Sequence, residues 1–286
     1  FNILVILFEK TELNSFIDII FALKIATAGA SFAFFLQERF SNKLRKIFIV
    51  ILSICYAFMQ YNIAQSSNIM WLDGVYMLPL ILLGVHNLVR KEKIHLLSVS
   101  VGLSIIFNWY VAGINCLFSV IWFILEICFK ELEENNIIKT KILNFIKSGV
   151  KYASSMLLGV MLSAVIFLPT IVLLRNGKGE FDLKMLTNSF NGNIISVVQN
   201  YTLGSVSNPS MVSLFCGSIP IIGCMGYFTS EYINKFKKII MGIFLTVMIM
   251  IYYWQPTNLI FTLLKNASSY WFRYSYISIF SLLFVS

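Results

Sequence analysis

Long apolar stretches recur along this 286-residue chain and constrain its fold more than any other feature. A helix needs about 20 apolar residues to cross a hydrocarbon core about 30 Å thick. Only 12% of the residues are charged, against about 25% in soluble domains, and 58% are hydrophobic. The alternating ten-residue segments of a transmembrane β-barrel do not occur. The sequence therefore predicts an all-α, polytopic helical membrane protein with a single transmembrane domain over residues 1–286.

About nine spans are expected, and a tight hairpin around Asn108-Trp109-Tyr110 should join the fourth to the fifth. A long polar outer loop is expected over residues 175–209. Because the chain begins with Phe1 and stops inside an apolar run at Ser286, we expect a fragment truncated at both ends. The predicted spans are approximately 16–36, 47–59, 70–89, 94–110, 113–129, 152–173, 211–229, 239–254 and 270–286.

The distribution of Lys and Arg predicts the orientation. Of the 22 basic residues, fifteen fall in loops on one side of the predicted spans and five on the other, and the two sets alternate without a break. Cytoplasmic loops carry the excess of Lys and Arg, so the side with fifteen should face the cytoplasm. The net charge of +9 is explained in this way and gives no reason to expect a nucleic-acid partner. The expected location is the cytoplasmic membrane, with multiple passes.

Two charged residues lie where charge is costly. Asp73 follows Asn68-Ile69-Met70-Trp71-Leu72 at the start of a long apolar helix, so it should sit at the outer boundary or in a polar cavity. Lys24 lies within the first span, six residues after Asp18, which is a poor helical pairing distance. Lys24 either snorkels to the interface or points inward at an anionic group. Small residues at three- and four-residue spacing beside it favour the inward alternative.

Several amides and aromatic side chains are expected at the outer level of three neighbouring spans. Amides that form hydrogen bonds, together with flat aromatic rings, suit a sugar, whose faces are apolar and whose edges carry hydroxyls. An ordinary interfacial aromatic belt with scattered amides is the alternative. The residues in question are Tyr61, Asn62, Asn68, Trp71, Asp73, Asn108 and Tyr110.

The last span begins in an aromatic cluster that contains Arg273. Arginine is a natural partner for a phosphate, because it is always charged and can donate two parallel hydrogen bonds, although lipid headgroups could equally bind it. The five cysteines form no metal-binding pattern, and His86 and His95 are expected to be solvated or to snorkel beside a basic loop. No metal site is predicted, and the charged segment 130–151 is expected to be a solvated linker or an interfacial helix.

These elements together resemble the YfhO family of bacterial membrane proteins. The resemblance rests on Phe1-Asn2-Ile3, on Lys24, and on Asn68-Ile69-Met70-Trp71-Leu72-Asp73 followed by Leu78-Pro79-Leu80 and Gly84. It also rests on Asn108-Trp109-Tyr110 and on the aromatic cluster around Arg273, and it extends over the whole chain.

The resemblance implies a glycosyltransferase of the C-type class (GT-C), with its site on the outer face. Such an enzyme moves a sugar from a polyprenyl-phosphate carrier to an extracytoplasmic acceptor, such as lipoteichoic acid or another wall polymer or glycolipid of a Gram-positive cell envelope. It also implies that the principal catalytic carboxylate precedes this fragment. A divalent metal is possible in the class, but no cofactor is identified.

Within these limits Asp73 is the best candidate for a catalytic carboxylate, in a supporting or substrate-binding role. Lys24 and Arg273 are candidates for binding phosphate, and both are expected to face one outward-opening cavity. Asn68, Trp71, Asn108 and Tyr110 are candidates for substrate binding. Two alternatives stay open. A transporter or flippase of a lipid-linked precursor would favour internal repeats, which are not evident, and a non-catalytic scaffold would leave Asp73 and Arg273 without a task.

Overall fold

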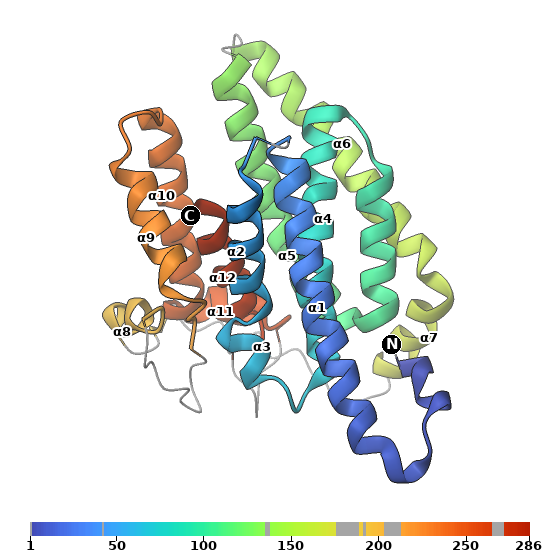
Figure 1. The fold of residues 1–286 in the computed structure, drawn as a ribbon. Coiled ribbons are helices and arrows are strands. Elements are labelled where there is room, and N and C mark those ends of the chain that lie inside the picture. The colour runs from blue at the N-terminus through green and yellow to red at the C-terminus, as the bar shows by residue number, and fades with distance from the viewer. Residues whose placement is uncertain are drawn as a thin grey trace.

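The fold is a bundle of helices, shown in Figure 1 as a computed structural model. The structure describes residues 2–41, 43–134, 138–175, 189–190, 193–202, 213–264 and 272–286. Within these ranges every regular element is a helix, apart from an isolated β-bridge between Phe190 and Trp254. The predicted all-α class is therefore confirmed. Most of the predicted outer loop lies outside the described residues, and the part that is described contains a short helix, α8.

The helices follow one another along the chain without intervening strands. Three short 3-10 helices are η1 (Asn2–Leu7), η2 (Lys10–Glu12) and η3 (Ile69–Trp71). The α-helices are α1 (Leu13–Arg39), α2 (Lys46–Ala57), α3 (Gln60–Ala64), α4 (Leu72–Lys91), α5 (His95–Glu134), α6 (Ile138–Leu162), α7 (Ala164–Arg175), α8 (Ile194–Gln199), α9 (Ser218–Thr229), α10 (Lys235–Tyr253), α11 (Gln255–Phe261) and α12 (Ser275–Val285).

Helix α4 lies at the centre of the first half of the chain. It is apolar on nearly every side, and 16 of its 20 residues are buried, as expected for a helix enclosed by others. A Cβ atom on Gly84 would lie 2.7 Å from the backbone of Leu97 in α5, so the glycine allows the two helices to approach closely. Helix α1 packs on α4 from another side (Figure 1).

Helix α5 reverses direction at Asn108, whose φ of −158° and ψ of 99° are not helical. Before the break the chain runs antiparallel to α4, since Leu97 lies against Gly84 and Phe107 lies near Tyr76. After the break it runs parallel to α4, because Asn115 contacts Gly74 and Glu126 contacts His86. The predicted hairpin around Asn108 is therefore present.

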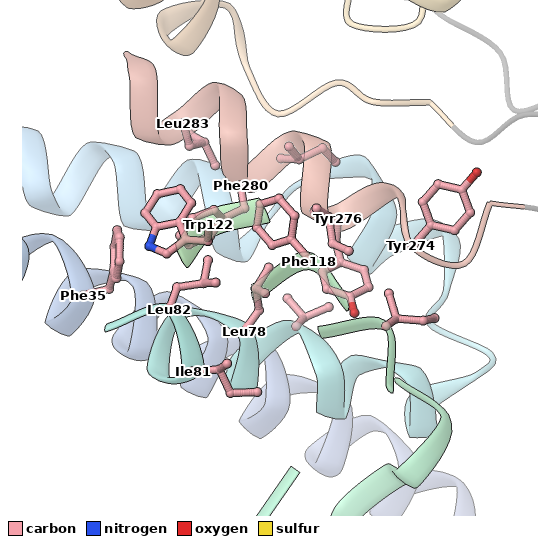
Figure 2. Close-up of a cluster of buried hydrophobic side chains, with 14 of the residues drawn as sticks. Phe35, Leu78, Ile81, Leu82, Phe118, Trp122, Tyr274, Tyr276, Phe280 and Leu283 are labelled. Atoms are coloured by element: carbon pink, nitrogen blue, oxygen red, sulfur yellow. The ribbon is translucent and has the colours of Figure 1, made fainter. Parts of the chain in front are cut away.

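An aromatic core joins the first helices to the last one. Trp122 of α5 makes edge-on contacts with Phe280 of α12 at 5.6 Å and with Phe35 of α1 at 5.9 Å between ring centroids (Figure 2). Phe280 also packs against Phe32 at 5.4 Å. Offset and edge-on pairs of this kind add to the stability gained from close packing. The contacts hold α12 against a scaffold formed more than 150 residues earlier in the sequence.

The count of nine spans exceeds what helix length supports. Among the described residues, five helices are long and apolar enough to cross a membrane, or six if α6 and α7, which meet at an 80° bend, form one broken span. The difference has two causes. The segments before and after Asn108 run in opposite directions but are counted together as the single helix α5, and α9 and α12 have only 12 and 11 helical residues. The multi-pass character is confirmed.

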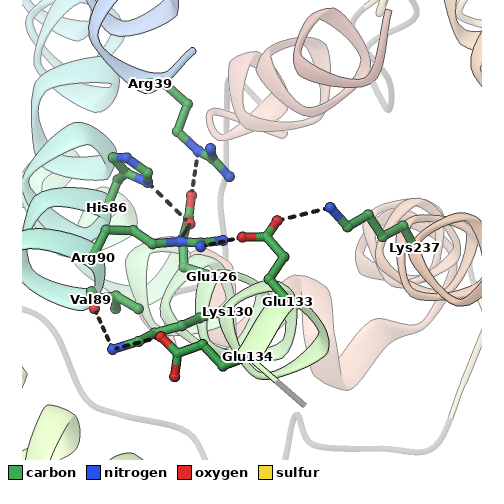
Figure 3. A network of polar contacts seen from close by, with 9 residues as sticks. All are labelled: Arg39, His86, Val89, Arg90, Glu126, Lys130, Glu133, Glu134 and Lys237. Atoms are coloured by element: carbon green, nitrogen blue, oxygen red, sulfur yellow. Dashed lines mark hydrogen bonds and ion pairs between the residues drawn. The ribbon is translucent and has the colours of Figure 1, made fainter. Parts of the chain in front are cut away.

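The basic loops gather at one end of the bundle, as the charge alternation requires. Glu133 at the end of α5 pairs with Arg90 of α4 at 2.5 Å and with Lys237 of α10 at 2.8 Å (Figure 3). Glu92 pairs with Lys151 of α6 at 2.6 Å. Of the two alternatives for 130–151, these contacts favour the helix over the solvated linker, because the described parts of this segment are helical and contribute to interhelical ion pairs.

Candidate functional site

Lys24 points inward and binds Asp73. Its Nζ lies 2.6 Å from Oδ1 of Asp73 and donates a second hydrogen bond, of 2.9 Å, to the carbonyl of Ile69. The side chain of Lys24 is 3% exposed and that of Asp73 is 12% exposed. The hydroxyl of Tyr76, one turn further along α4, donates to the same carboxylate at 2.9 Å. The inward alternative for Lys24 is therefore confirmed, and its anionic partner within the chain is Asp73.

The reason given for this inward position holds only in part: Gly29 packs closely against α2, but other small residues of the set do not pack in the bundle. The small residues Ala22, Ala26 and Ala30 of α1 are exposed rather than packed in the bundle. The buried stripe of α1 instead consists of Ile20, Lys24, Ala28 and larger side chains at the same three- and four-residue spacing. Lys24 is drawn inward because it lies on the apolar face of its helix, where Asp73 neutralises its charge.

Arg273 lies in a cage of aromatic rings. Its guanidinium carbon is 4.5 Å from the ring centroid of Trp71 and 5.6 Å from that of Tyr110. The hydroxyl of Tyr61 donates to the carbonyl of Arg273 at 2.8 Å, which fixes the backbone before α12. Contact with the two rings orients the planar guanidinium.

Asparagine side chains complete the same region. The Nδ2 of Asn108 donates to the carbonyl of Met70 at 2.9 Å, and that of Asn115 donates to the carbonyl of Gly74 at 2.9 Å. The hydroxyl of Tyr276 in α12 donates to Oδ1 of Asn115 at 2.6 Å. The amide of Asn115 is buried and that of Asn108 is half-buried, and their hydrogen bonds tie α4, α5 and α12 together.

All these contacts converge on residues 69–74, which we call the 69–74 segment. The described contacts to it come from Lys24 of α1, from Asn108 and Asn115 of α5, and from Arg273 before α12. The segment lies at the end of the bundle opposite the basic loops (Figure 1). The site therefore combines residues from four regions that are up to 250 positions apart in the sequence.

The structure brings together six of the seven predicted site residues. Lys24 and Asp73 form one pair, Trp71, Tyr110 and Arg273 form the aromatic cage, and Asn108 binds the backbone beside them. The seventh, Asn68, is half-buried, and its described side-chain contact is to Ser67 at 3.4 Å. Lys24 and Arg273 approach the same segment, but the Lys24 ammonium is already bound to Asp73.

A second buried polar group was missed by the sequence analysis. Glu126 of α5 is 1% exposed and pairs with Arg39 at 2.8 Å, with His86 at 3.2 Å and with Arg90 at 4.0 Å (Figure 3). His86 is 6% exposed, so the expectation of a solvated or snorkelling imidazole was wrong. The available signal was a glutamate inside an apolar run, where an unpaired charge is costly.

Metal binding finds no support among the described residues, which contain no group of three or more His, Cys, Asp and Glu side chains placed to hold an ion. The divalent metal that the class allows stays an expectation. The five cysteines are free thiols, of which Cys216 is buried and the others are partly exposed.

Comparison with known proteins assigns the family. No curated protein and no solved structure matches the chain. The sequence model of the family described as "Bacterial membrane protein YfhO" matches residues 1–286, which is the full length given. A match over the whole chain agrees with the motifs around Asp73, Asn108 and Arg273. The chain therefore belongs to the YfhO family of bacterial membrane proteins.

Proposed function

We propose that this chain forms part of a membrane glycosyltransferase that transfers a sugar from a polyprenyl-phosphate carrier to an extracytoplasmic acceptor. The observation that carries the proposal is the convergence of an arginine cage and a buried ion pair on the 69–74 segment, at the end opposite the basic loops. By the positive-inside rule this end faces outward, where a lipid-linked donor and a wall polymer such as lipoteichoic acid would meet.

The chemistry requires charge stabilisation at the leaving group. An acceptor hydroxyl attacks the anomeric carbon, its proton passes to a base, and the bond from that carbon to the phosphate oxygen breaks. The departing polyprenyl phosphate keeps the electron pair and gains negative charge. Arg273 is suited to this anion, because Trp71 and Tyr110 fix the plane of its guanidinium before the substrate arrives.

Asp73 supports the site rather than acting as a free base. Its carboxylate already accepts from Tyr76 within α4 and pairs with Lys24, and the ion pair holds it against the middle of α1. This arrangement fixes the first turn of α4 and, through the adjacent residues, the position of Trp71 under Arg273. We therefore assign Asp73 and Lys24 a positioning role, and we assign Trp71, Tyr110 and Asn108 contacts to the donor sugar or its phosphate.

The test is sugar transfer by the purified full-length protein, reconstituted in lipid with a polyprenyl-phosphate-linked labelled sugar and a glycolipid acceptor. Arg273→Gln should lower kcat/KM by about 100-fold or more, the effect typical of removing a group that stabilises transition-state charge. Arg273→Lys should retain part of the rate but raise KM for the donor, because the two-pronged geometry is lost.

The matched control is Arg45→Gln, an exposed arginine at the opposite end, which should leave turnover unchanged. The hydrogen bond from Tyr61 reaches the backbone carbonyl of Arg273, so the Gln variant retains that anchor. Wild-type transfer by Arg273→Gln would contradict the assignment of Arg273. Movement of the lipid-linked sugar across vesicles without any transfer would favour the flippase alternative over the enzyme.

A further inference from the structure

Among the described residues, a buried glutamate near the end of α5 lacks a hydrogen-bond donor for one of its carboxylate oxygens. Glu131 is 9% exposed, whereas the side chains of Glu133 and Glu134 in the same turn are each 43% exposed. The Oε1 of Glu131 accepts one long hydrogen bond, of 3.4 Å, from the Nδ2 of Asn144, and its buried Oε2 accepts none. A buried carboxylate is costly unless a cation or several donors satisfy it. Glu131 therefore has capacity for a further donor.

Glu131 lines a small pocket between α5 and α6, which we call the Glu131 pocket. Its volume is about 270 Å³, just below the range of roughly 300–1,000 Å³ that is typical of sites for drug-sized molecules. The pocket can therefore hold a headgroup, but not a whole lipid. Its wall consists of Ile127, Cys128 and Glu131 of α5 and of Lys141, Ile142 and Phe145 of α6.

Lys141 supplies the opposite charge in the same wall. Its ammonium is paired with no carboxylate among the described residues, although Glu131 lines the same pocket. The rest of the wall consists of a thiol and apolar side chains. The pocket thus offers one anionic acceptor and one cation that do not contact each other, with apolar surface around them. A ligand that carries both charges and a short apolar linker would complement this arrangement.

The Glu131 pocket lies where lipid headgroups are expected. It belongs to the end of the bundle that carries the basic loops, since Glu133 in the same turn of α5 pairs with Lys237 (Figure 3). The first turns of α6 expose Leu143 and Ile146 at 66% and 55%, close in sequence to the exposed Lys147. Exposed apolar side chains together with lysines are typical of a helix at the membrane interface. A lipid headgroup is therefore the nearest source of a zwitterionic ligand.

We propose that the Glu131 pocket binds the headgroup of phosphatidylethanolamine from the adjacent leaflet, with the ammonium at Glu131 and the phosphate at Lys141. A primary ammonium has three N–H donors, and the methylene groups that join it to the phosphate suit the apolar wall. The last torsion of a glutamate side chain is soft, so Oε2 can turn toward the donor. This inference does not depend on the proposed sugar transfer.

The chemistry of the wall disfavours other headgroups and bare metal ions. The quaternary ammonium of phosphatidylcholine has no N–H group to donate, and phosphatidylglycerol carries no cation. A calcium ion needs about six to eight oxygen ligands. Among the described side chains of the wall, only Glu131 offers oxygen atoms. The pocket should therefore select a primary ammonium.

Cys128 in the wall provides the readout, because a bound headgroup should cover its partly exposed thiol. The full-length protein is reconstituted in phosphatidylcholine vesicles with or without phosphatidylethanolamine. The rate at which methyl methanethiosulfonate, a small neutral thiol reagent, modifies each cysteine is then measured by peptide mass spectrometry. Phosphatidylethanolamine should slow the modification of Cys128 by about two-fold or more, the factor reached at half occupancy, and phosphatidylglycerol should not. Cys55 and Cys224, which are also partly exposed but lie on other helices, should react equally in all vesicles.

Two pairs of variants test the two charges. Glu131→Gln keeps the shape of the side chain but removes its charge, so it should abolish the protection of Cys128 and leave the rate in pure phosphatidylcholine unchanged. Its matched control is Glu134→Gln, in the same turn but outside the pocket wall, which should retain the protection. Lys141→Gln should weaken the protection, whereas Lys147→Gln, exposed on the same helix, should not. Equal protection by phosphatidylglycerol, protection that survives in Glu131→Gln, or equal slowing at all cysteines would each overturn the proposal.

Discussion

Removing the Lys24 side chain should destabilise the protein through the charge that it leaves behind. In Lys24→Met the Asp73 carboxylate keeps its place at the start of α4, but it loses an ammonium at 2.6 Å. The hydroxyl of Tyr76 still donates to it, and no other cation is paired with it among the described residues. Methionine keeps much of the apolar volume of lysine, so packing in α1 changes little.

The magnitude follows from burial. Breaking a buried ion pair by removing one partner costs about 3–5 kcal/mol, whereas an exposed pair contributes about 0–1 kcal/mol. The Asp73 side chain is 12% exposed and retains one hydrogen bond, so we expect the lower end of that range, about 3 kcal/mol. In the double variant Lys24→Met/Asp73→Asn no charge is left buried, and the amide oxygen can still accept from Tyr76. The double variant should therefore recover most of the stability that Lys24→Met loses.

The assay is reversible unfolding of the purified protein in mixed micelles by titration with SDS, which gives the free energy of unfolding for each variant. Lys46→Met, at an exposed position at the start of α2, is the control and should stay within about 0.5 kcal/mol of the parent. A cost below about 1 kcal/mol for Lys24→Met, or a double variant no more stable than the single one, would refute a buried, mutually neutralising pair.

The same pair changes how Asp73 should be tested for function. From the sequence, Asp73→Asn is expected to reduce sugar transfer without affecting folding, because the shape is kept. The structure shows that this substitution strands the Lys24 ammonium, which is 3% exposed. Loss of activity in Asp73→Asn therefore needs comparison with Lys24→Met/Asp73→Asn. If activity returns in the double variant together with stability, Asp73 acts by positioning the site.

Gly74→Ala should destabilise the bundle by about 1–3 kcal/mol, because a Cβ there would lie 1.8 Å from a valine methyl carbon on α5. A Cβ atom on Gly149 in α6 would have no neighbour within 4 Å, so Gly149→Ala should be neutral or stabilising by up to about 1 kcal/mol in the same SDS titration. Equal effects at the two glycines would contradict the close packing at Gly74. Asn108→Ala should lower the free energy of unfolding by about 1–2 kcal/mol, because the Oδ1 of Asn108 caps the helix by accepting from the first backbone N–H groups after the hairpin. An unchanged unfolding curve would contradict this capping role. Cysteines placed at the exposed positions Ser67 and Lys43 should differ in intact cells, where an impermeant thiol reagent should label only the first; the reverse pattern would invert the orientation.

Periodicity and charge were enough to predict the fold class and the gathering of the basic loops. Both depend on solvation alone: apolar runs must enter the membrane, and an excess of Lys and Arg marks one side. The hairpin at Asn108 was also predictable, since polar and aromatic residues interrupt an apolar run there. The number of complete spans was not predictable from the sequence. The two segments that meet at Asn108 and short helices such as α9 have the same apolar composition as full spans.

The residues of the site were recognisable by type, but their partners were not. Lys24, Asp73 and Arg273 stood out because charge is expensive at membrane depth. Nothing along the chain showed that Lys24 would bind Asp73, or that Arg273 would stack on Trp71, because these partners are about 50 and 200 positions apart. Glu126 carried the same signal of a charge inside an apolar run and was missed, and its three basic partners, from α1 and α4, are likewise distant in the sequence. Hydrophobic pattern is a local property of the sequence, whereas the neutralisation of a buried charge depends on which helices pack together, and only the tertiary structure decides that.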